Sequence, residues 1–334
     1  MSTPRENVVK SVGSNVATEP AVSVIMPAYN VAPYIGEALD SAFAQTFKNY
    51  EVIVVNDGSP DSEELERVLA PYRDRIVYIV QENRGLAGAR NTAIRVARGE
   101  FIALLDSDDA WEPDYLKVQI EMMRSDPSID VLYSDARIFG DGEGVGRTLM
   151  DMCPSEGEVT FERMLTQECN VLICATARRA TVIRVGMFDE SLRSSEDFDL
   201  WLRIIKSGGR IAYHRQILAR YRRRPSSLSA DPVWMCEHIL QVFDKTHRTM
   251  TLVPHEREVL ERQRARFHAM LSLHEGKRAF AKGDYPAAIQ NLTEANSFLK
   301  KPKIKVSILM LRSAPGLLRW VYHLRNKYVF HAEA

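Results

Sequence analysis

The strongest constraint on this chain is an alternation, between residues 21 and 106, of short apolar runs with longer segments of helical period. The apolar runs are AVSVIMP, YEVIVVN, RIVYIVQ and FIALLD, and the segments between them begin at Ala32, Ser62 and Gly85. Continuous apolar runs are typical of strands buried on both faces, and the helices between them supply the crossovers that parallel strands need. The order therefore predicts an α/β fold, with a mostly parallel sheet covered by helices on both faces.

Polar, turn-forming residues follow each of the four apolar runs, as PAYN, NDGS, QENRG and DSDD. Parallel strands place their carboxyl ends at one edge of the sheet, and open α/β sheets bind ligands there. Each of these ends carries groups that can bond a nucleotide, so the four together predict a ligand site at this edge.

The most charged of the four ends holds three carboxylates, Asp106, Asp108 and Asp109. Such a cluster can cap the next helix, bind a metal ion, or act as acid and base. Capping needs one carboxylate, and Pro113 already suits the start of the next helix. Like charges repel unless a cation offsets them, and Mg²⁺ and Mn²⁺ prefer oxygen ligands and often bridge to phosphates. The pattern therefore favours a metal–diphosphate site over a cap.

Composition excludes several other classes of protein. The chain has 44 Lys and Arg against 44 Asp and Glu, so nothing in its overall charge indicates a nucleic-acid partner. Its four cysteines form no CxxC pair, which favours a reduced, cytoplasmic setting. Residues 1–20 are polar, so we expect a disordered leader and no signal peptide. There is no apolar run of about 18 residues that could span a membrane.

Beyond residue 135 the alternation weakens, but two segments carry charge at defined places. In GMFDESLRSSEDFDLWLRIIKSGG a loop precedes a helix, and Glu196 and Asp197 lie at its start, where the helix dipole favours negative charge. Residues 221–229, YRRRPSSLS, indicate a basic loop. Gly99, just past the third helix, is expected to form a left-handed cap.

Residues 231–334 are expected to form a separate helical region after a main domain of residues 21–230. HEGKRAFAKGDYPAAIQNLTEAN predicts two short helices joined at Gly283 and Asp284, and it resembles one tetratricopeptide unit. A single unit cannot build a solenoid, so a plain helical hairpin packed on the main domain is the other interpretation. From Lys300 onward the sequence contains eight Lys or Arg and only one acidic residue, Glu333. This basic amphipathic tail, with Trp320, fits either an anionic membrane surface or a helix packed on the protein with its basic face in water.

Five motifs in order carry a resemblance to a known family. VSVIMPAYN, EVIVVNDGS, ENRGLAGARNTAI, GEFIALLDSDD and FDESLRSSEDFDLWLRI together resemble a family 2 glycosyltransferase, over about residues 21–229. The resemblance implies the GT-A fold, a nucleotide-sugar donor that is most often UDP-linked, a divalent Mn²⁺ or Mg²⁺ ion, and inversion at the anomeric carbon. It also implies an acceptor that is a glycan, lipid or protein, in cell-surface glycan or polysaccharide biosynthesis.

The resemblance also implies a donor site. Its nucleoside pocket would be lined by Pro27, Ala28, Tyr29 and Asn30. Asp57 would accept a hydrogen bond from the uracil ring N–H, Arg84 would lie near the base and diphosphate, and Arg90 near the acidic cluster. From the residues alone, Asp57 could instead close a turn with Gly58, and Arg84 could be a surface cation.

The same resemblance assigns the chemistry. Asp106 would touch ribose or metal, Asp108 would ligate the metal, and Asp109 would either ligate it or orient the loop. Asp197 would be the general base, with Glu196 beside it, although both also suit a helix start. A loop closing over the diphosphate would contain Arg222, Arg224 and Ser227; the family commonly has a histidine near Arg224, which this chain lacks.

Two other classes of protein fit the pattern less well. A sugar-nucleotide pyrophosphorylase usually has a glycine-rich basic loop after its first strand, and PAYNVAPY has none. A nucleotide-binding protein without activity would not need both Asp108 and Asp197. The resemblance thus favours a cytoplasmic transferase, either free or held at the inner face of the membrane by its tail.

Overall fold

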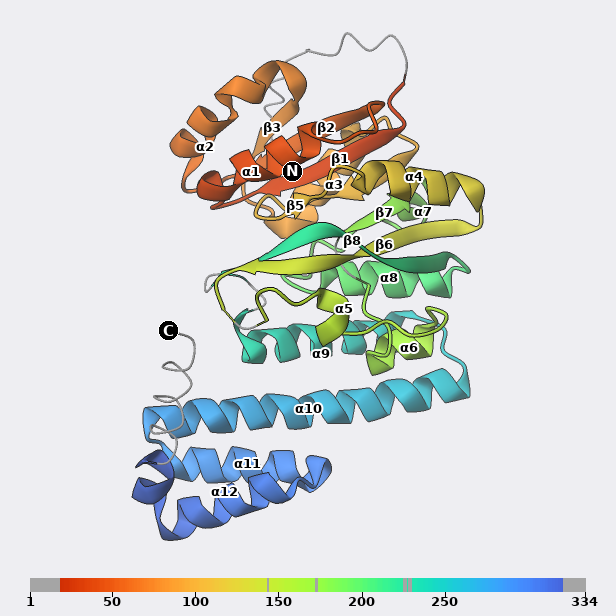
Figure 1. The fold of residues 1–334 in the computed structure, drawn as a ribbon. Coiled ribbons are helices and arrows are strands. Elements are labelled where there is room, and N and C mark those ends of the chain that lie inside the picture. The colour runs from red at the N-terminus through yellow and green to blue at the C-terminus, as the bar shows by residue number, and fades with distance from the viewer. Residues whose placement is uncertain (1–18, 143, 172–173, 225–226, 228–229, 321–334) are drawn as a thin grey trace, which may run out of the picture. The chain divides into compact units, whose positions relative to one another are not determined.

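The structure is a computed structural model that describes residues 19–142, 144–171, 174–224, 227 and 230–320. The chain divides into two compact units, Met1–Ala230 and Asp231–Ala334. The expected leader, except for Glu19 and Pro20, and the end of the basic tail lie outside the described residues. Each unit is described below by itself (Figure 1).

The first unit is built on a sheet of eight strands, counted over the described residues, in the order β3-β2-β1-β4-β7-β6-β8-β5. The strands are β1 Val22–Ala28, β2 Tyr50–Asp57, β3 Val77–Gln81, β4 Phe101–Leu104, β5 Ala110–Trp111, β6 Ile129–Gly140, β7 Ala175–Arg178 and β8 Arg210–Arg223. The four strands predicted from the apolar runs are neighbours and all parallel, with Val22 opposite both Tyr50 and Phe101. Their carboxyl ends therefore meet at one edge, as the sequence predicts.

The other half of the sheet changes direction. Strand β7 runs antiparallel to both β4 and β6, and β6 and β8 are parallel to each other. The sheet is thus mixed, because β7 enters between two parallel groups. The long strands β6 and β8 bring the end of β8 beside β5 and the acidic residues that precede it.

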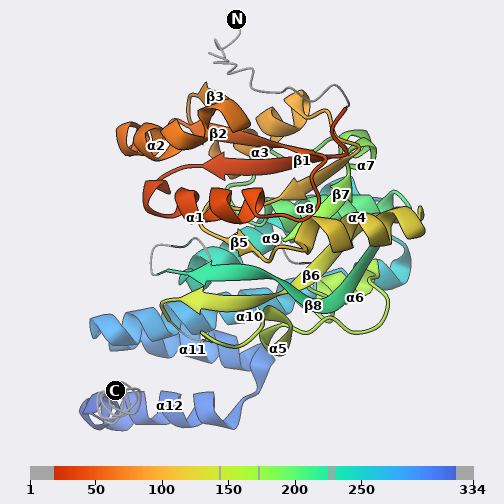
Figure 2. The same ribbon diagram turned by 45° about the horizontal axis from the view of Figure 1, so that its top comes forward.

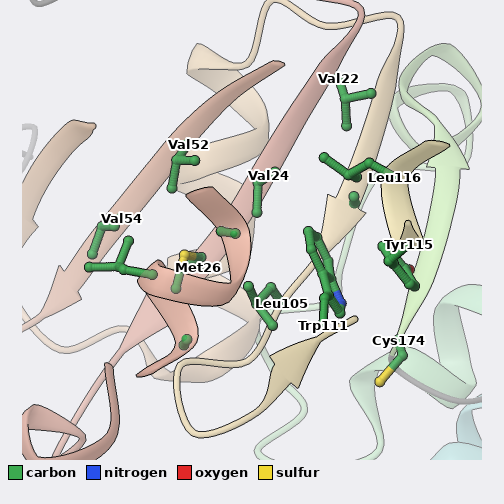
Figure 3. Packing of buried hydrophobic residues seen from close by; sticks show 14 of the residues in the cluster. Val22, Val24, Met26, Val52, Val54, Leu105, Trp111, Tyr115, Leu116 and Cys174 are labelled. Carbon is green, nitrogen blue, oxygen red and sulfur yellow. The ribbon is translucent and has the colours of Figure 1, made fainter. Parts of the chain in front are cut away.

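Helices cover both faces of the sheet, as predicted (Figures 1 and 2). They are α1 Ala32–Phe43, α2 Ser62–Leu69 with the 3-10 turn Ala70–Arg75, α3 Gly85–Val96, α4 Tyr115–Ser125, α5 Leu149–Met152, α6 Phe161–Thr166, α7 Arg179–Arg184 and α8 Glu196–Lys206. Figure 3 shows the core on one face of the sheet, to which every second residue of β1 and of β2 contributes a side chain. Val22, Val24 and Met26 join this cluster, whereas Ile25 is buried on the opposite side, toward which α3 packs.

The role expected for Gly99 is wrong. Helix α3 ends at Val96, its cap residue Ala97 is extended, and Gly99 has no positive φ. The glycine is required by a close approach: a Cβ there would lie 2.6 Å from the backbone N of Ser23 and 2.7 Å from the carbonyl carbon of Val22. The Gly99 N–H donates to the Ser23 hydroxyl at 2.9 Å, so this turn is docked against β1.

The expectation that residues 221–223 belong to a basic loop is also wrong. Residues 221–223 belong to β8, where they pair with β6. The proline that suggested a loop follows the strand and does not interrupt it, because Pro225 lies beyond its last residue.

The second unit is helical over its described residues, with α9 Pro232–Thr249, α10 Pro254–Lys282, α11 Tyr285–Leu299 and α12 Pro302–Ser313. Gly283, with a φ of 83°, ends α10, and the Asp284 carboxylate caps α11 by accepting from Ala287 N at 3.1 Å. The expected hairpin is present, but its first helix is not short: α10 has 29 residues, because no proline follows Pro254 before the hairpin turn.

Candidate active site

Asp57, at the end of β2, organises the loop after β3. Its Oδ1 accepts from Gln81 Nε2 at 2.6 Å and from Arg84 N at 2.9 Å, and the side chain is buried. The next residue, Gly58, has a φ of 63°, and a Cβ there would lie 2.8 Å from the backbone N of Asn83. Asp57 therefore ties the ends of β2 and β3 together through one of its two oxygens.

The Arg84 side chain reaches another element. Its Nη2 lies 2.7 Å from Oε2 of Glu190, in the loop before α8. Asn91 and Arg95 also donate to Glu190, at 2.9 and 3.1 Å. Burial acts to raise the pKa of Glu190, but the bonds from Asn91 and the two arginines outweigh it and leave that pKa lowered. Arg84 is thus part of a charge network and not an isolated surface cation.

Arg90 links the acidic strand end to the start of α8. It is 1% exposed, its Nη2 lies 2.7 Å from Asp106 Oδ1, and its Nη1 pairs with Glu196. Burial acts to lower the arginine's pKa, but Asp106 and Glu196 raise it overall. A buried guanidinium between two carboxylates fixes both in place, because removing it would leave buried negative charge without a partner.

The two carboxylates at the start of α8 lie in different environments. Glu196 is buried, and burial, opposed by Arg90, raises its pKa from 4.5 to about 7. Asp197 is only half-buried, and its Oδ1 accepts from Phe198 N at 2.7 Å. Burial raises the pKa of Asp197 as well, although Arg90 acts to lower it. Asp197 is therefore the more accessible of the two to a group outside the protein.

The loop of Asp106, Asp108 and Asp109 is held by its own backbone. Asp109 N donates to Asp106 O at 2.9 Å, and Ser107 Oγ donates to Pro27 O, at the end of β1, at 2.8 Å. The carboxylate of Asp109 is buried and accepts from Arg222 N at 2.7 Å, and burial holds its pKa well above the ordinary value. Asp109 thus faces into the protein and connects the loop to β8.

Asp108 faces the end of β8. Its Oδ2 lies 2.8 Å from Arg224 Nε, and its carbonyl accepts from Arg222 Nε at 2.7 Å. Burial and the nearby Asp106 raise the pKa of Asp108, and Arg224 opposes them. Ser227 N donates to Arg224 O at 3.0 Å, so Ser227 is joined to the backbone of this arginine.

Residues of α1 that the sequence did not single out complete this group. Glu37 pairs with Arg222 and with Arg220, and the Arg224 guanidinium lies 5.1 Å from the centre of the Tyr34 ring. Neither residue carries a motif, and the only available signal is that α1 directly follows the first polar strand end.

The end of β1 presents both buried and exposed residues. Pro27 and Ala28 are buried within the strand, whereas Tyr29 is 51% exposed. Asn30 has a φ of 53°, and its N–H donates to Ser59 Oγ at 2.7 Å. Of the four residues expected to line a nucleoside pocket, Tyr29 and Asn30 present exposed side chains.

The acidic loop has the chemistry for a divalent cation but not a complete protein cage. Among the described residues no group of three or more His, Cys, Asp and Glu is placed to hold a metal ion. Asp106 and Asp108 are close enough for the first to raise the pKa of the second, so negative charge gathers there in spite of the arginines. Two oxygen-donor residues fit Mg²⁺ or Mn²⁺, which commonly take one or two carboxylates and complete their shell with phosphate and water.

The fold and this arrangement define an α/β protein whose charged groups gather at the carboxyl edge of a parallel sheet. The family model for glycosyl transferase family 2 matches residues 23–191, about half of the chain. The chain therefore belongs to glycosyl transferase family 2.

Its relatives include proteins of other lengths. It is 36% identical over 215 residues to an uncharacterized glycosyltransferase of Rickettsia bellii. The aligned region covers 61% of this chain and 30% of the relative. The chain thus spans about a third of the length of the first relatives it matches. It is also 33% identical over 212 residues to Escherichia coli WfgD, named UDP-Glc:alpha-D-GlcNAc-diphosphoundecaprenol beta-1,3-glucosyltransferase, covering 63% of this chain and 80% of WfgD.

Solved structures agree on the fold. Staphylococcus aureus TarS in complex with UDP-GlcNAc gives a TM-score of 0.60 at 21% identity, over 84% of this chain and 92% of the other. The mannosyltransferase PcManGT of Pyrobaculum calidifontis, in complex with GDP-Man and Mn²⁺, gives a TM-score of 0.59 at 22% identity. The match covers 92% of this chain and 87% of PcManGT. The predicted GT-A fold is confirmed.

Proposed function

We propose that the protein is an inverting glycosyltransferase that moves a sugar from a UDP-sugar to an acceptor hydroxyl in the synthesis of a cell-surface glycan or polysaccharide. One observation carries the proposal: Arg90 holds both Asp106, on the acidic strand end, and the start of α8, where the partly buried Asp197 lies. A base and a diphosphate site must be fixed relative to each other for transfer, and this ion pair provides that connection.

In the proposed reaction Asp197 accepts the proton of the acceptor hydroxyl. The acceptor oxygen forms its bond to the anomeric carbon from the side opposite the leaving group. The bond between that carbon and the diphosphate oxygen breaks, and the nucleoside diphosphate leaves with the electron pair. Attack from the opposite side inverts the configuration, and no nucleophile from the protein is required.

The other residues bind and orient. Asp106 and Asp108 would hold Mn²⁺ or Mg²⁺, whose charge would offset that of the leaving diphosphate. Arg222 and Arg224 lie next to Asp108. Together with Ser227 they would close over the diphosphate and exclude water. Tyr29 and Asn30 would meet the nucleoside, and Asp57 would accept from the uracil ring while Arg84 lies toward the base and diphosphate.

The donor and acceptor assignments draw on the relatives. UDP-linked donors are named for both WfgD and the TarS complex, whereas PcManGT binds GDP-Man. We therefore place UDP first and GDP second. The acceptor named for WfgD is a diphosphate-linked lipid, which supports a lipid-linked glycan acceptor and a site of action at the inner face of the cell membrane.

Thermal unfolding tests the proposal. The protein is melted with UDP, GDP, CDP or dTDP, each with and without Mn²⁺, because a ligand at 100 times its Kd adds about 2.7 kcal/mol of stability. A rise in melting temperature with UDP that needs Mn²⁺, and that Asp108→Asn abolishes, supports the donor site. If a different diphosphate gives the rise, the UDP assignment is wrong. If none does, the protein is not a nucleotide-sugar transferase of the proposed kind.

A further inference from the structure

The second unit carries a surface that the proposed transfer reaction does not use. Helix α12 packs against α11 along one side (Figure 2). Ile304 and Leu311 are buried there, with Ile308 beside them, against Ala288 and Leu292 of α11. These α12 positions follow helical spacing, so they define the inner side of the helix.

The outer side of α12 is also apolar at its centre. Val306 is 55% exposed and Leu309 is 65% exposed. They lie on one face with exposed Lys305 and Arg312, since residues three, four and seven positions apart share a face. The outer face of α12, defined by Lys305, Val306, Leu309 and Arg312, therefore presents two aliphatic side chains flanked by cations.

The segment that contains this face carries only positive charge. From Lys300 to Trp320 there is no Asp or Glu, and six Lys or Arg are all exposed. They are Lys300, Lys301, Lys303, Lys305, Arg312 and Arg319. In the helical turn after α12, Leu317 and Trp320 are also more than half exposed. Exposed apolar groups in such a field suit a partner that is apolar inside and negatively charged at its surface.

We propose that the outer face of α12 binds the surface of an anionic lipid bilayer, with Val306 and Leu309 entering the headgroup region and the lysines and arginines meeting lipid phosphates. Trp320 fits the same boundary, where its ring and N–H meet apolar and polar surroundings. In this proposal the contact is peripheral, with α12 at the bilayer surface. Among the described residues no helix has both the length and the apolar character to span a membrane.

Two other partners fit the face less well. A second copy of the chain, paired symmetrically through this face, would bring Lys305 and Arg312 against like charges. Nucleic acid would meet the cations but would leave Val306 and Leu309 without an apolar partner. The proposal does not depend on transferase activity, and it concerns only the second unit.

Flotation with lipid vesicles tests it on the full chain. One vesicle is phosphatidylcholine alone, and the other is equal parts phosphatidylcholine and phosphatidylglycerol. We expect binding to the anionic vesicles only, and a loss of about tenfold or more in Leu309→Glu, which replaces an inserted side chain by a repelled one. Lys305→Gln and Arg312→Gln should each weaken binding about fivefold, the effect of one cation near an anionic surface.

Val253→Glu is the matched control, because Val253 lies in the same unit and its exposed fraction, 54%, is similar to the 55% of Val306. It should bind vesicles as the wild type does, and circular dichroism should show that both glutamate variants are folded. Binding should also shift the tryptophan emission of the wild type to shorter wavelength, and Trp320→Phe should lose most of that shift.

Three results would overturn the proposal. One is equal binding to neutral and anionic vesicles, and another is vesicle binding by Leu309→Glu that matches Val253→Glu. The third is a dimer in solution that Leu309→Glu dissociates, without vesicle binding by the wild type, which would assign the face to a second copy.

Discussion

Arg224 Nε lies 2.8 Å from Asp108 Oδ2, so the arginine just after β8 and an aspartate of the acidic loop form an ion pair. Both side chains are mostly buried. The oxygen that faces Arg224 is also one of those that a divalent cation would use. In the proposed site Arg224 and a cation would therefore compete for Asp108, and a diphosphate that attracts Arg224 away would free the carboxylate for the metal.

This competition predicts that Arg224→Ala binds Mn²⁺ more tightly than the wild type in the absence of nucleotide. The gain should be about tenfold or more, since a hydrogen bond to a charged group is worth about 1.5–3 kcal/mol. The variant should also bind UDP–Mn²⁺ more weakly, because it has lost a cation facing the diphosphate. Free Mn²⁺ measured by electron paramagnetic resonance reports the first effect directly.

Arg220→Ala is the control for that experiment. Arg220 lies in β8, four residues before Arg224, and pairs with Glu37 and Glu112 instead of the acidic loop. It should leave Mn²⁺ affinity unchanged. Equal or weaker Mn²⁺ binding by Arg224→Ala would show that the ion pair does not limit access to Asp108.

The base assignment predicts that Asp197→Asn retains the melting shift with UDP and Mn²⁺ but loses about 10²- to 10⁴-fold in transfer rate, the usual contribution of a general base. Its neighbour Glu196 is buried against Arg90, so Glu196→Gln should lose less. Transfer assayed with each variant at saturating donor separates the two. Transfer by Asp197→Asn at nearly the wild-type rate would remove Asp197 from the mechanism.

The parts that the sequence predicts well are those set by local pattern. The apolar runs predict β1 to β4 and their direction, and the polar residues that follow them place Asp57 and Asp106 at one edge. The parts it misses depend on contacts distant in sequence. Glu37 and Glu190 carry no motif, and each becomes part of a charge network only when an arginine from another element docks beside it.

Local pattern fails in the same way elsewhere. The antiparallel insertion of β7 has no signature in its four residues, because pairing is decided by the neighbours it meets. Gly99 follows a helix in sequence, so the sequence alone favours a helix cap. Its actual cause, the backbone of β1 at contact distance, is visible only once the chain is folded.

Arg90→Met should destabilise the first unit by about 3–5 kcal/mol, because it removes the counter-charge of the buried Glu196 and of Asp106. The double variant Arg90→Met/Glu196→Gln should recover part of the loss, since it no longer buries an unpaired carboxylate. Urea unfolding of the four proteins in this cycle measures the coupling. Additive effects of the two substitutions would mean that the pair is not coupled in the folded protein.

The raised pKa of Glu196 predicts a pH-dependent stability. Its pKa is 4.5 ordinarily and about 7 in the folded protein, so the folded state binds the proton more tightly than the unfolded state. The stability that this proton contributes is present below pH 4.5 and is lost as the pH rises to about 7. Relative to Glu196→Gln, the wild type should therefore become less stable across this range. Parallel profiles of unfolding free energy for the two proteins would contradict the shift.

The close approach at Gly99 gives a test of the fold beneath the site. In Gly99→Ala the new Cβ would meet the backbone of β1 at 2.6 and 2.7 Å and Phe101 O at 2.8 Å, and none of these atoms can move without parting β1 from β4. Overpacking of this kind costs about 1–3 kcal/mol. Gly36→Ala is the matched substitution in α1, where the nearest atom is Val68 Cγ1 at 3.5 Å, and helix propensity should make it stabilising by up to about 1 kcal/mol. Urea midpoints should therefore move in opposite directions. Unchanged midpoints for Gly99→Ala would show that this contact is looser than the structure has it.

The same pair of variants also tests the link between the fold and the site. Because the loops after β1 and β4 carry the proposed donor site, Gly99→Ala should weaken the Mn²⁺-dependent melting shift, whereas Gly36→Ala should not.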